Sequence, residues 1–407
     1  MFSFYLFIII VLVIILLYFF YNNKLTPTNK NNLREMYAEG LDLLVSGKRV
    51  AAYKNFKSII NKDSNNVGAY LRLGQILRES GKTNQALKIH KSLIFRKNIS
   101  SYELIELHKN LALNYFELNN FNKSIDECKK ILKLENNNEW AINHLILLYK
   151  KDNNWKEATE YLKMYFNKIG KTDSHKLALF KIQDARVNTS NKKFVEAREI
   201  LDRALNIDDQ IGLTYYFIGK TYSEESGLEY DKAISLEKNG LNSMSDKEEY
   251  NKHIDSAKKL LSKAIPMWVH FLEINPEQSW LVLPLLKDAL FALDRYSEVE
   301  LILTKSIDRF PENTEVLASL ADYYANKGDF DKALEIIDKA LVKNNNSILV
   351  KLIKFKLNVQ HSSGKISVNE IDDIINIILK DTDYQMMSDK KSNKDIKWLL
   401  DNNDEFD

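Results

Sequence analysis

Cysteine, proline and glycine are all scarce in this chain of 407 residues. A single cysteine, Cys128, excludes an internal disulfide framework and a zinc site built from four cysteines. Five prolines and 12 glycines leave few breaks, which favours long helices over a strand-and-turn fold. The formal net charge of +2 argues against a nucleic-acid-binding protein, because such a protein would need a basic stripe. These scarcities together predict an all-α chain.

Motifs for catalysis and metal binding are missing as well. The seven histidines are scattered, and none lies in an H-E-x-x-H motif or pairs with the cysteine at zinc-ligand spacing. The run Val45-Ser46-Gly47-Lys48 lacks the first glycine of a phosphate loop. We therefore expect no enzymatic activity, no cofactor and no metal.

What the chain does contain is a repeating pattern of small residues. Gly40 precedes Gly74 by 34 residues, and Ala52 precedes Ala86 by the same interval. A 34-residue period is that of the tetratricopeptide repeat (TPR), a helix–turn–helix unit whose two helices meet at small residues. One hairpin cannot bury its apolar face alone, so a stacked solenoid is expected. The small residues at repeat-packing positions are Gly40, Ala52, Gly74, Ala86, Ala158, Ala197, Gly219 and Ala333.

This period predicts how the chain is organised. We expect an array of about eight repeats over residues 33–345. A charged insertion near 226–258 interrupts the sixth repeat, as either an exposed helical excursion or a mobile loop. Residues 346–380 follow as a degenerate repeat or capping helices, and residues 381–407 as a polar tail.

The N-terminus has a different composition. Residues 2–21 carry no charge, and at about 1.5 Å per residue a helix of this length reaches about 30 Å, one hydrocarbon thickness. A cleaved signal peptide is the alternative, but no basic residue precedes the run and no small-residue cleavage site follows it. We therefore expect a transmembrane anchor over residues 1–23 and a linker over 24–32. Lys24, Lys30 and Arg34 then predict a single-pass protein of the inner (cytoplasmic) membrane with its soluble domain in the cytoplasm.

The first helices of a TPR array line its concave face, where partner proteins bind. Counting from the small residue of each unit predicts seven groove residues, five of them basic: Arg78, Lys109, Phe116, Lys150, Arg186, Tyr216 and Lys220. Such a surface suits an acidic segment or the C-terminal carboxylate of a partner protein. The same positions are also compatible with an ordinary solvated helix face.

The second repeat carries a more specific pattern, made of Leu71, Leu73, Gly74, Arg78, Gly81, Ala86, Ile89 and His90. With the apolar N-terminus and the first repeat, it resembles the family of lipopolysaccharide assembly protein B. The resemblance implies a membrane-anchored adaptor that works with a membrane AAA+ protease and promotes turnover of the lipid A deacetylase. That family closes with a rubredoxin-like zinc module held by four cysteines, whereas no cysteine follows Ala340 here, so we expect no zinc. The alternative is a general TPR scaffold for envelope biogenesis or secretion, with no protease link.

Overall fold

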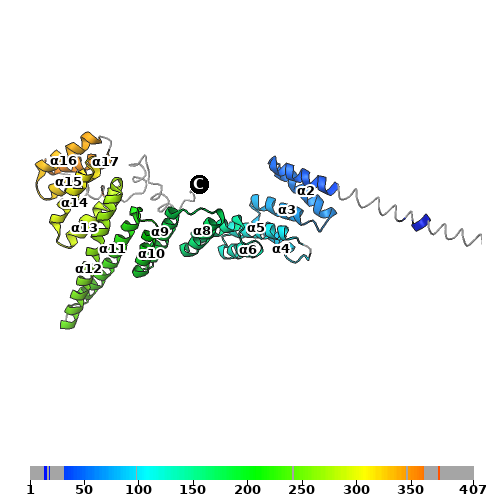
Figure 1. Ribbon diagram of the computed structural model, residues 1–407, viewed down its shortest axis with the longest axis horizontal. Coiled ribbons are helices and arrows are strands. Elements are labelled where there is room, and N and C mark those ends of the chain that lie inside the picture. The colour runs from blue at the N-terminus through cyan, green and yellow to red at the C-terminus, as the bar shows by residue number, and fades with distance from the viewer. Residues whose placement is uncertain are drawn as a thin grey trace, which may run out of the picture. The chain divides into compact units, whose positions relative to one another are not determined.

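The structure is a computed structural model that describes residues 13–15, 18, 32–97, 99–240, 243–344, 347–361 and 375. The regular elements of these residues are all helices (Figure 1). The chain divides into two compact units. Unit 1 comprises Met1–Asp152 and Glu160–Gly170, and unit 2 comprises Asn153–Thr159 and Lys171–Asp407.

The prediction of a single-pass inner-membrane protein is wrong for the part of the chain that the structure describes. No helix there is both long enough and apolar enough to cross a bilayer. Of the apolar run over residues 2–21, only residues 13–15 and 18 are described, so most of the predicted anchor lies outside the described residues. The predicted linker also lies outside them, apart from residue 32.

Unit 1 is built from successive helical hairpins. A helix over residues 32–45 precedes α2 (Arg49–Lys62). α3 (Val67–Glu79) pairs with α4 (Thr83–Leu93), α5 (Ser101–Glu117) pairs with α6 (Phe121–Leu134), and α7 (Glu139–Lys151) follows. α8 (Trp155–Ile169) is divided, with its residues up to Thr159 in unit 2 and those from Glu160 in unit 1. The asparagines Asn66, Asn120 and Asn138 begin α3, α6 and α7, and each side chain accepts a hydrogen bond from the backbone N–H three residues on. Gly81 ends the turn between α3 and α4 at a φ of +75°, which glycine adopts without strain.

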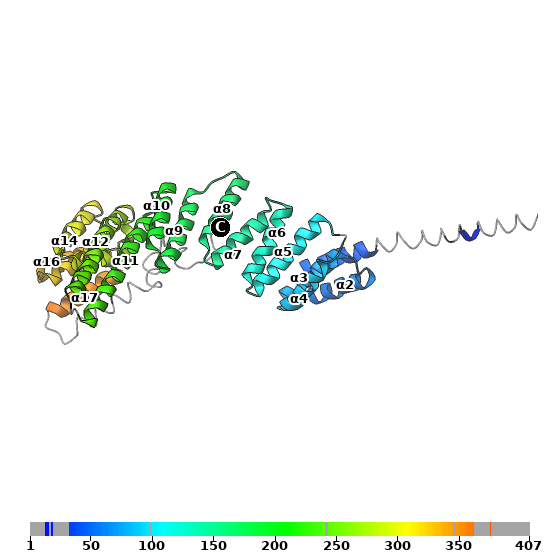
Figure 2. The same cartoon turned by 90° about the horizontal axis from the view of Figure 1, so that it is seen from below.

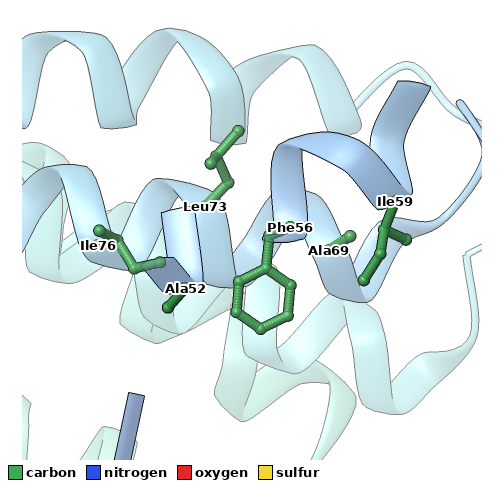
Figure 3. Close-up of a cluster of buried hydrophobic side chains, with 6 residues drawn as sticks. All are labelled: Ala52, Phe56, Ile59, Ala69, Leu73 and Ile76. Atoms are coloured by element: carbon green, nitrogen blue, oxygen red, sulfur yellow. The ribbon is translucent and has the colours of Figure 1, made fainter. Parts of the chain in front are cut away.

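A cluster of six apolar side chains holds α2 against α3 (Figure 3). Ala52, Phe56 and Ile59 recur every three or four residues, which places them on one face of α2. They meet Ala69, Leu73 and Ile76 of α3, and all six are at most 7% exposed. Burial of about 25 cal/mol per Å² of apolar surface makes such clusters the main stabilising contribution between neighbouring helices.

Three of the packing glycines each lie directly beneath an aromatic ring. A Cβ on Gly40 would meet the ring of Phe56 at 2.8 Å, and one on Gly74 would meet His90 Nε2 at 2.2 Å. In unit 2, a Cβ on Gly219 would meet Trp268 Nε1 at 2.4 Å. Glycine is therefore required wherever the second helix of a hairpin presses a ring onto the first. The alanines of the same set, Ala52, Ala86, Ala158, Ala197 and Ala333, are all 0% exposed.

Unit 2 continues the series of hairpins. It contains α9 (Ser174–Ser190) with α10 (Phe194–Ile207), α11 (Gly212–Asn239) with α12 (Met244–Ile274), the 3-10 helix η1 (Pro276–Leu281), α13 (Leu283–Ala292) with α14 (Tyr296–Arg309), α15 (Thr314–Asn326) with α16 (Phe330–Lys343), and α17 (Ile348–His361). α17 lies in the stretch predicted as capping helices. Beyond it the structure describes residue 375 alone, so the predicted polar tail lies outside the described residues.

The insertion in the sixth repeat lengthens both helices of that hairpin. α11 has 28 residues and α12 has 31, and together they form the long hairpin seen in Figure 1. Ser226 Oγ donates a hydrogen bond to the Ala257 carbonyl oxygen at 2.8 Å, and His253 Nδ1 lies 2.6 Å from Glu229 Oε2. These contacts pair the two halves of the insertion, so the described part of it is a helical excursion and not a loop.

Candidate protein-binding surfaces

All seven predicted groove residues lie on the first helices of their hairpins, but the two units divide them. Unit 1 contains Arg78, Lys109, Phe116 and Lys150, on α3, α5 and α7. Unit 2 contains Arg186, Tyr216 and Lys220, on α9 and α11. The seven side chains are all half-buried. The seven predicted residues are therefore divided between the two units and do not form one groove-lining set within either unit.

Arg78 belongs to a buried network that joins α3 to α5. Its Nη1 donates to Asn110 Oδ1 at 3.0 Å and lies 3.4 Å from Asn114 Oδ1. Asn114 Nδ2 in turn donates to His90 Nδ1 at 2.7 Å, so the ring proton of neutral His90 is on Nε2, which donates to the Leu71 carbonyl oxygen at 3.2 Å. Burial lowers the pKa of His90 to about 4, with a smaller contribution from the charge of Arg78. The hydrogen bonds of Arg78 therefore link α3 to α5 within the chain.

A group of rings and lysines on α5 and α7 is more accessible. We define the aromatic patch as Lys109, Phe116, Trp140, His144 and Lys151. Trp140 stacks on His144 with ring centroids 4.8 Å apart, and Phe116 lies 5.4 Å from His144. The ammonium group of Lys109 lies 5.1 Å from the centre of the Trp140 ring, and that of Lys151 lies 5.9 Å from the centre of the Phe116 ring.

His144 is the buried centre of this aromatic patch. It is 8% exposed, and burial lowers its pKa to about 4, so its imidazole is neutral near pH 7. Its Nε2 makes no hydrogen bond in the structure. Aromatic residues are enriched in protein–protein interfaces, and Trp above all among the residues that contribute most binding energy, so the rings of this patch suit a protein contact.

The polar groups of the three predicted residues in unit 2 interact mainly with other residues of the same chain. Arg186 Nη1 donates to Gln183 Oε1 at 2.7 Å, and its guanidinium lies 5.4 Å from the ring of Phe217. Burial raises the pKa of Tyr216, while the charge of Arg186 opposes this rise. Lys220 Nζ lies 3.7 Å from Glu224 Oε1, one helical turn on. The positive charges of this group are therefore partly neutralised by its own helices.

A cavity of about 490 Å³ lies elsewhere in unit 2, among η1, α13, α14, α15 and α17. Its walls are mainly leucine, isoleucine and valine side chains. Asp322 lines it between two lysines: Oδ2 accepts from Lys287 Nζ at 3.0 Å and Oδ1 from Lys356 Nζ at 2.9 Å. Burial alone would raise the pKa of Asp322, but the two lysines outweigh burial and lower it. The cavity therefore combines an apolar wall with a buried charged cluster.

Sequence comparison agrees with the helical hairpins. Residues 290–354 match the tetratricopeptide repeat family. The described residues form an all-α array of helical hairpins, and in residues 290–354 these hairpins match tetratricopeptide repeats.

Individual relatives of this TPR protein differ in extent. Lipopolysaccharide assembly protein B of Escherichia coli (strain K12) is 21% identical over 321 residues, which cover 75% of this chain and 78% of that protein. Interferon-induced protein with tetratricopeptide repeats 3 of Mus musculus is 34% identical over 83 residues, 20% of each chain. A solved tetratricopeptide repeat protein of Parabacteroides merdae is 14% identical, with coverage of 81% of this chain and 99% of that one, but its TM-score of 0.33 is too low to support an argument.

The cavity residues of the TPR array were not among the seven sequence candidates, although the sequence holds a signal for them. Lys287, Asp322 and Lys356 follow one another at intervals of 35 and 34 residues, about one repeat. A charged residue that recurs with the repeat period on first helices faces the same side of successive hairpins. None of the seven predicted groove residues lies beyond Lys220.

Proposed function

We propose that this TPR protein is a non-enzymatic scaffold that holds partner proteins on its first helices during lipopolysaccharide assembly. The observation that carries the proposal is the similarity to lipopolysaccharide assembly protein B, because it extends over 78% of that protein. The TPR architecture supports a binding role, since stacked hairpins present long rows of first-helix side chains to partners.

The aromatic patch is the surface on which we expect the partner to dock in unit 1. Trp140 and Phe116 offer apolar area at a low cost in side-chain entropy, and Lys109 and Lys151 add charge at the edge. An acidic partner segment with an apolar anchor would satisfy both components. Such a segment could also present a hydrogen-bonding group to His144 Nε2.

The finer part of the proposal concerns the partners. We propose that the two partners are an AAA+ protease and the lipid A deacetylase. By binding both, the scaffold would promote degradation of the deacetylase by the protease. Depletion of the protein in its own host should then raise the deacetylase level, measured by immunoblotting after protein synthesis is stopped. A deacetylase half-life that does not change on depletion would reject the protease link and leave the general scaffold.

A pair of variants tests the docking surface itself. Trp140→Ala should reduce recovery of partners in a pull-down analysed by mass spectrometry, because it removes the largest ring of the aromatic patch. Tyr102→Ala is the matched control, since Tyr102 lies on neighbouring α5, is 71% exposed and is outside the patch. Circular dichroism checks that both variants keep their helices. Equal recovery with the two variants would contradict docking at the patch.

A further inference from the structure

Basic residues are concentrated on the second helices of unit 1. The helices α2, α4 and α6 together contain ten lysines and arginines but two acidic residues, a net charge of +8. The second helices α10, α14 and α16 of unit 2 contain seven basic and nine acidic residues, a net charge of −2. The whole chain carries only +2, so the excess on unit 1 is a local feature and not a consequence of overall composition.

Part of this excess surrounds a cavity lined by α6 and by Tyr115 of α5. The helices α4, α5 and α6 follow one another in unit 1 (Figures 1 and 2). We define the lysine face as Lys91, Lys123, Lys129, Lys130 and Lys133. The four lysines of α6 line a cavity of about 380 Å³ together with Tyr115, Asp126 and Glu127. Lys91, on α4, lies near the same tyrosine: its Nζ is 5.6 Å from the Tyr115 ring, and Lys123 Nζ is 5.7 Å from that ring.

The acidic residues of the cavity neutralise only part of this charge. Glu127 is bound on one side by His108, with Nδ1 to Oε2 at 2.6 Å, and on the other by Lys130, with Nζ to Oε1 at 2.8 Å. Asp126 then lines the cavity together with Lys123 and Lys133. Like charges held close together repel one another, and an anionic ligand would relieve this repulsion.

We propose that the lysine face is a second docking surface, and that it binds an acidic segment of a partner protein. An acidic protein segment fits better than a nucleic acid for two reasons. The rings beneath the lysines, Tyr115 and Tyr149, are 8% and 6% exposed, so they cannot stack on bases. In addition, α4 and α6 contain no arginine, the residue best suited to paired contacts with phosphates.

This surface is independent of the aromatic patch, because the patch lies on the first helices α5 and α7. A scaffold with one surface on each helix layer could hold two partners at once, which raises the effective concentration of one partner near the other. The inference does not rest on a role in lipopolysaccharide assembly. It depends on the excess of basic residues on the second helices of unit 1.

The test uses the full chain and a fluorescent 20-residue peptide of alternating glutamate and glycine, with binding followed by anisotropy. The triple variant Lys91→Gln, Lys123→Gln and Lys133→Gln should raise the dissociation constant about tenfold or more, equivalent to about 1.4 kcal/mol, and should flatten its dependence on salt. The matched control is Lys305→Gln, Lys339→Gln and Lys343→Gln on α14 and α16 of unit 2, which should leave binding within about twofold. Tyr102→Ala, which lies outside both surfaces, should also bind the peptide normally. Recovery of partners with Trp140→Ala remains the separate test of the proposed function, so failure of one does not imply failure of the other.

Three results would overturn the inference. The first is equal loss of peptide binding in the two triple variants, and the second is no loss in either. The third is tighter, lysine-face-dependent binding of a single-stranded 20-mer oligonucleotide or of phosphatidylglycerol vesicles than of the peptide, which would assign the surface to another class of anion. Carbodiimide cross-linking of the peptide provides a direct check, because the cross-linked lysines identified by mass spectrometry should be those of the lysine face.

Discussion

The close contact between Gly74 and His90 predicts that any side chain at position 74 destabilises the protein. In Gly74→Ala, the new Cβ would lie 2.2 Å from His90 Nε2 and 2.5 Å from Cε1, so the ring must move. The ring is 0% exposed, and its nitrogens are hydrogen-bonded to the Leu71 carbonyl oxygen and to Asn114. Movement therefore strains the packing and breaks hydrogen bonds together.

The magnitude follows from these two costs. Overpacking costs about 1–3 kcal/mol and leaving buried polar groups unpaired costs about 1–3 kcal/mol, while replacing a helical glycine by alanine returns about 1 kcal/mol. We expect Gly74→Ala to lower the free energy of unfolding by about 1–5 kcal/mol. Urea denaturation followed by circular dichroism measures the change, and hydrogen exchange should locate it in α3 and α4.

Two further variants make the reasoning refutable. Gly227→Ala is the matched control, because Gly227 also lies within a helix but a Cβ there would meet no atom within 4 Å, and it should stabilise the protein by up to about 1 kcal/mol. His90→Ala removes the obstructing ring, so adding Gly74→Ala to it should cost little more. Gly74→Ala that leaves stability unchanged, or that is additive with His90→Ala, would refute this account of the glycine.

Three further outcomes are expected. Because burial lowers the pKa of His90 and of His144 to about 4, the unfolded chain binds protons that the folded chain does not, so stability should fall as pH falls from about 6.5 towards 4. At pH 5 the loss should be about 2 kcal/mol for each histidine, measured as the urea midpoint at pH 7 and pH 5. Asp322→Asn removes the carboxylate that binds Lys356, which is 2% exposed, and should cost about 3–5 kcal/mol in thermal unfolding, whereas Lys287→Ala at the edge of the cavity should cost less than about 1 kcal/mol. Ala86→Leu adds volume at a position that is 0% exposed and should cost about 1–3 kcal/mol, so an unchanged thermal midpoint would contradict the helix pairing.

The helical hairpins could be predicted from sequence because their determinants are local and periodic. The 34-residue interval from Gly40 to Gly74 marks two hairpins by itself, and asparagine N-caps such as Asn66 mark where helices begin. The insertion was harder, since its choice between loop and helix depends on contacts such as Ser226 with Ala257, 31 residues away. Its charged sequence contains no local signal for that pairing.

The candidate site was predicted less well than the fold, for a physical reason. Helix periodicity predicts which face of a helix carries a side chain, but it does not predict which hydrogen-bond or charge partners the next repeat places beside that side chain. Arg78 lies on the first helix α3, yet Asn110 and Asn114 of α5 accept its hydrogen bonds. Lys356 is the opposite case, a charged residue that is not among the seven predicted groove residues. Its ammonium group lies beside Asp322 because α15 and α17 pack together. Neither arrangement can be seen within one repeat.

The three rings that cover the packing glycines also determine how the array comes apart. Phe56 and Trp268 have no proton to gain, whereas the imidazole of His90 does. Neighbouring hairpins stabilise one another in a stacked array, so heat opens it from its ends, where each hairpin has a single neighbour. Protonation of His90 acts instead on the second hairpin, between the first and the third, and breaks their coupling. Acid would therefore weaken unit 1 at an internal hairpin through His90, as well as at α7 through His144, whereas heat acts from the ends alone.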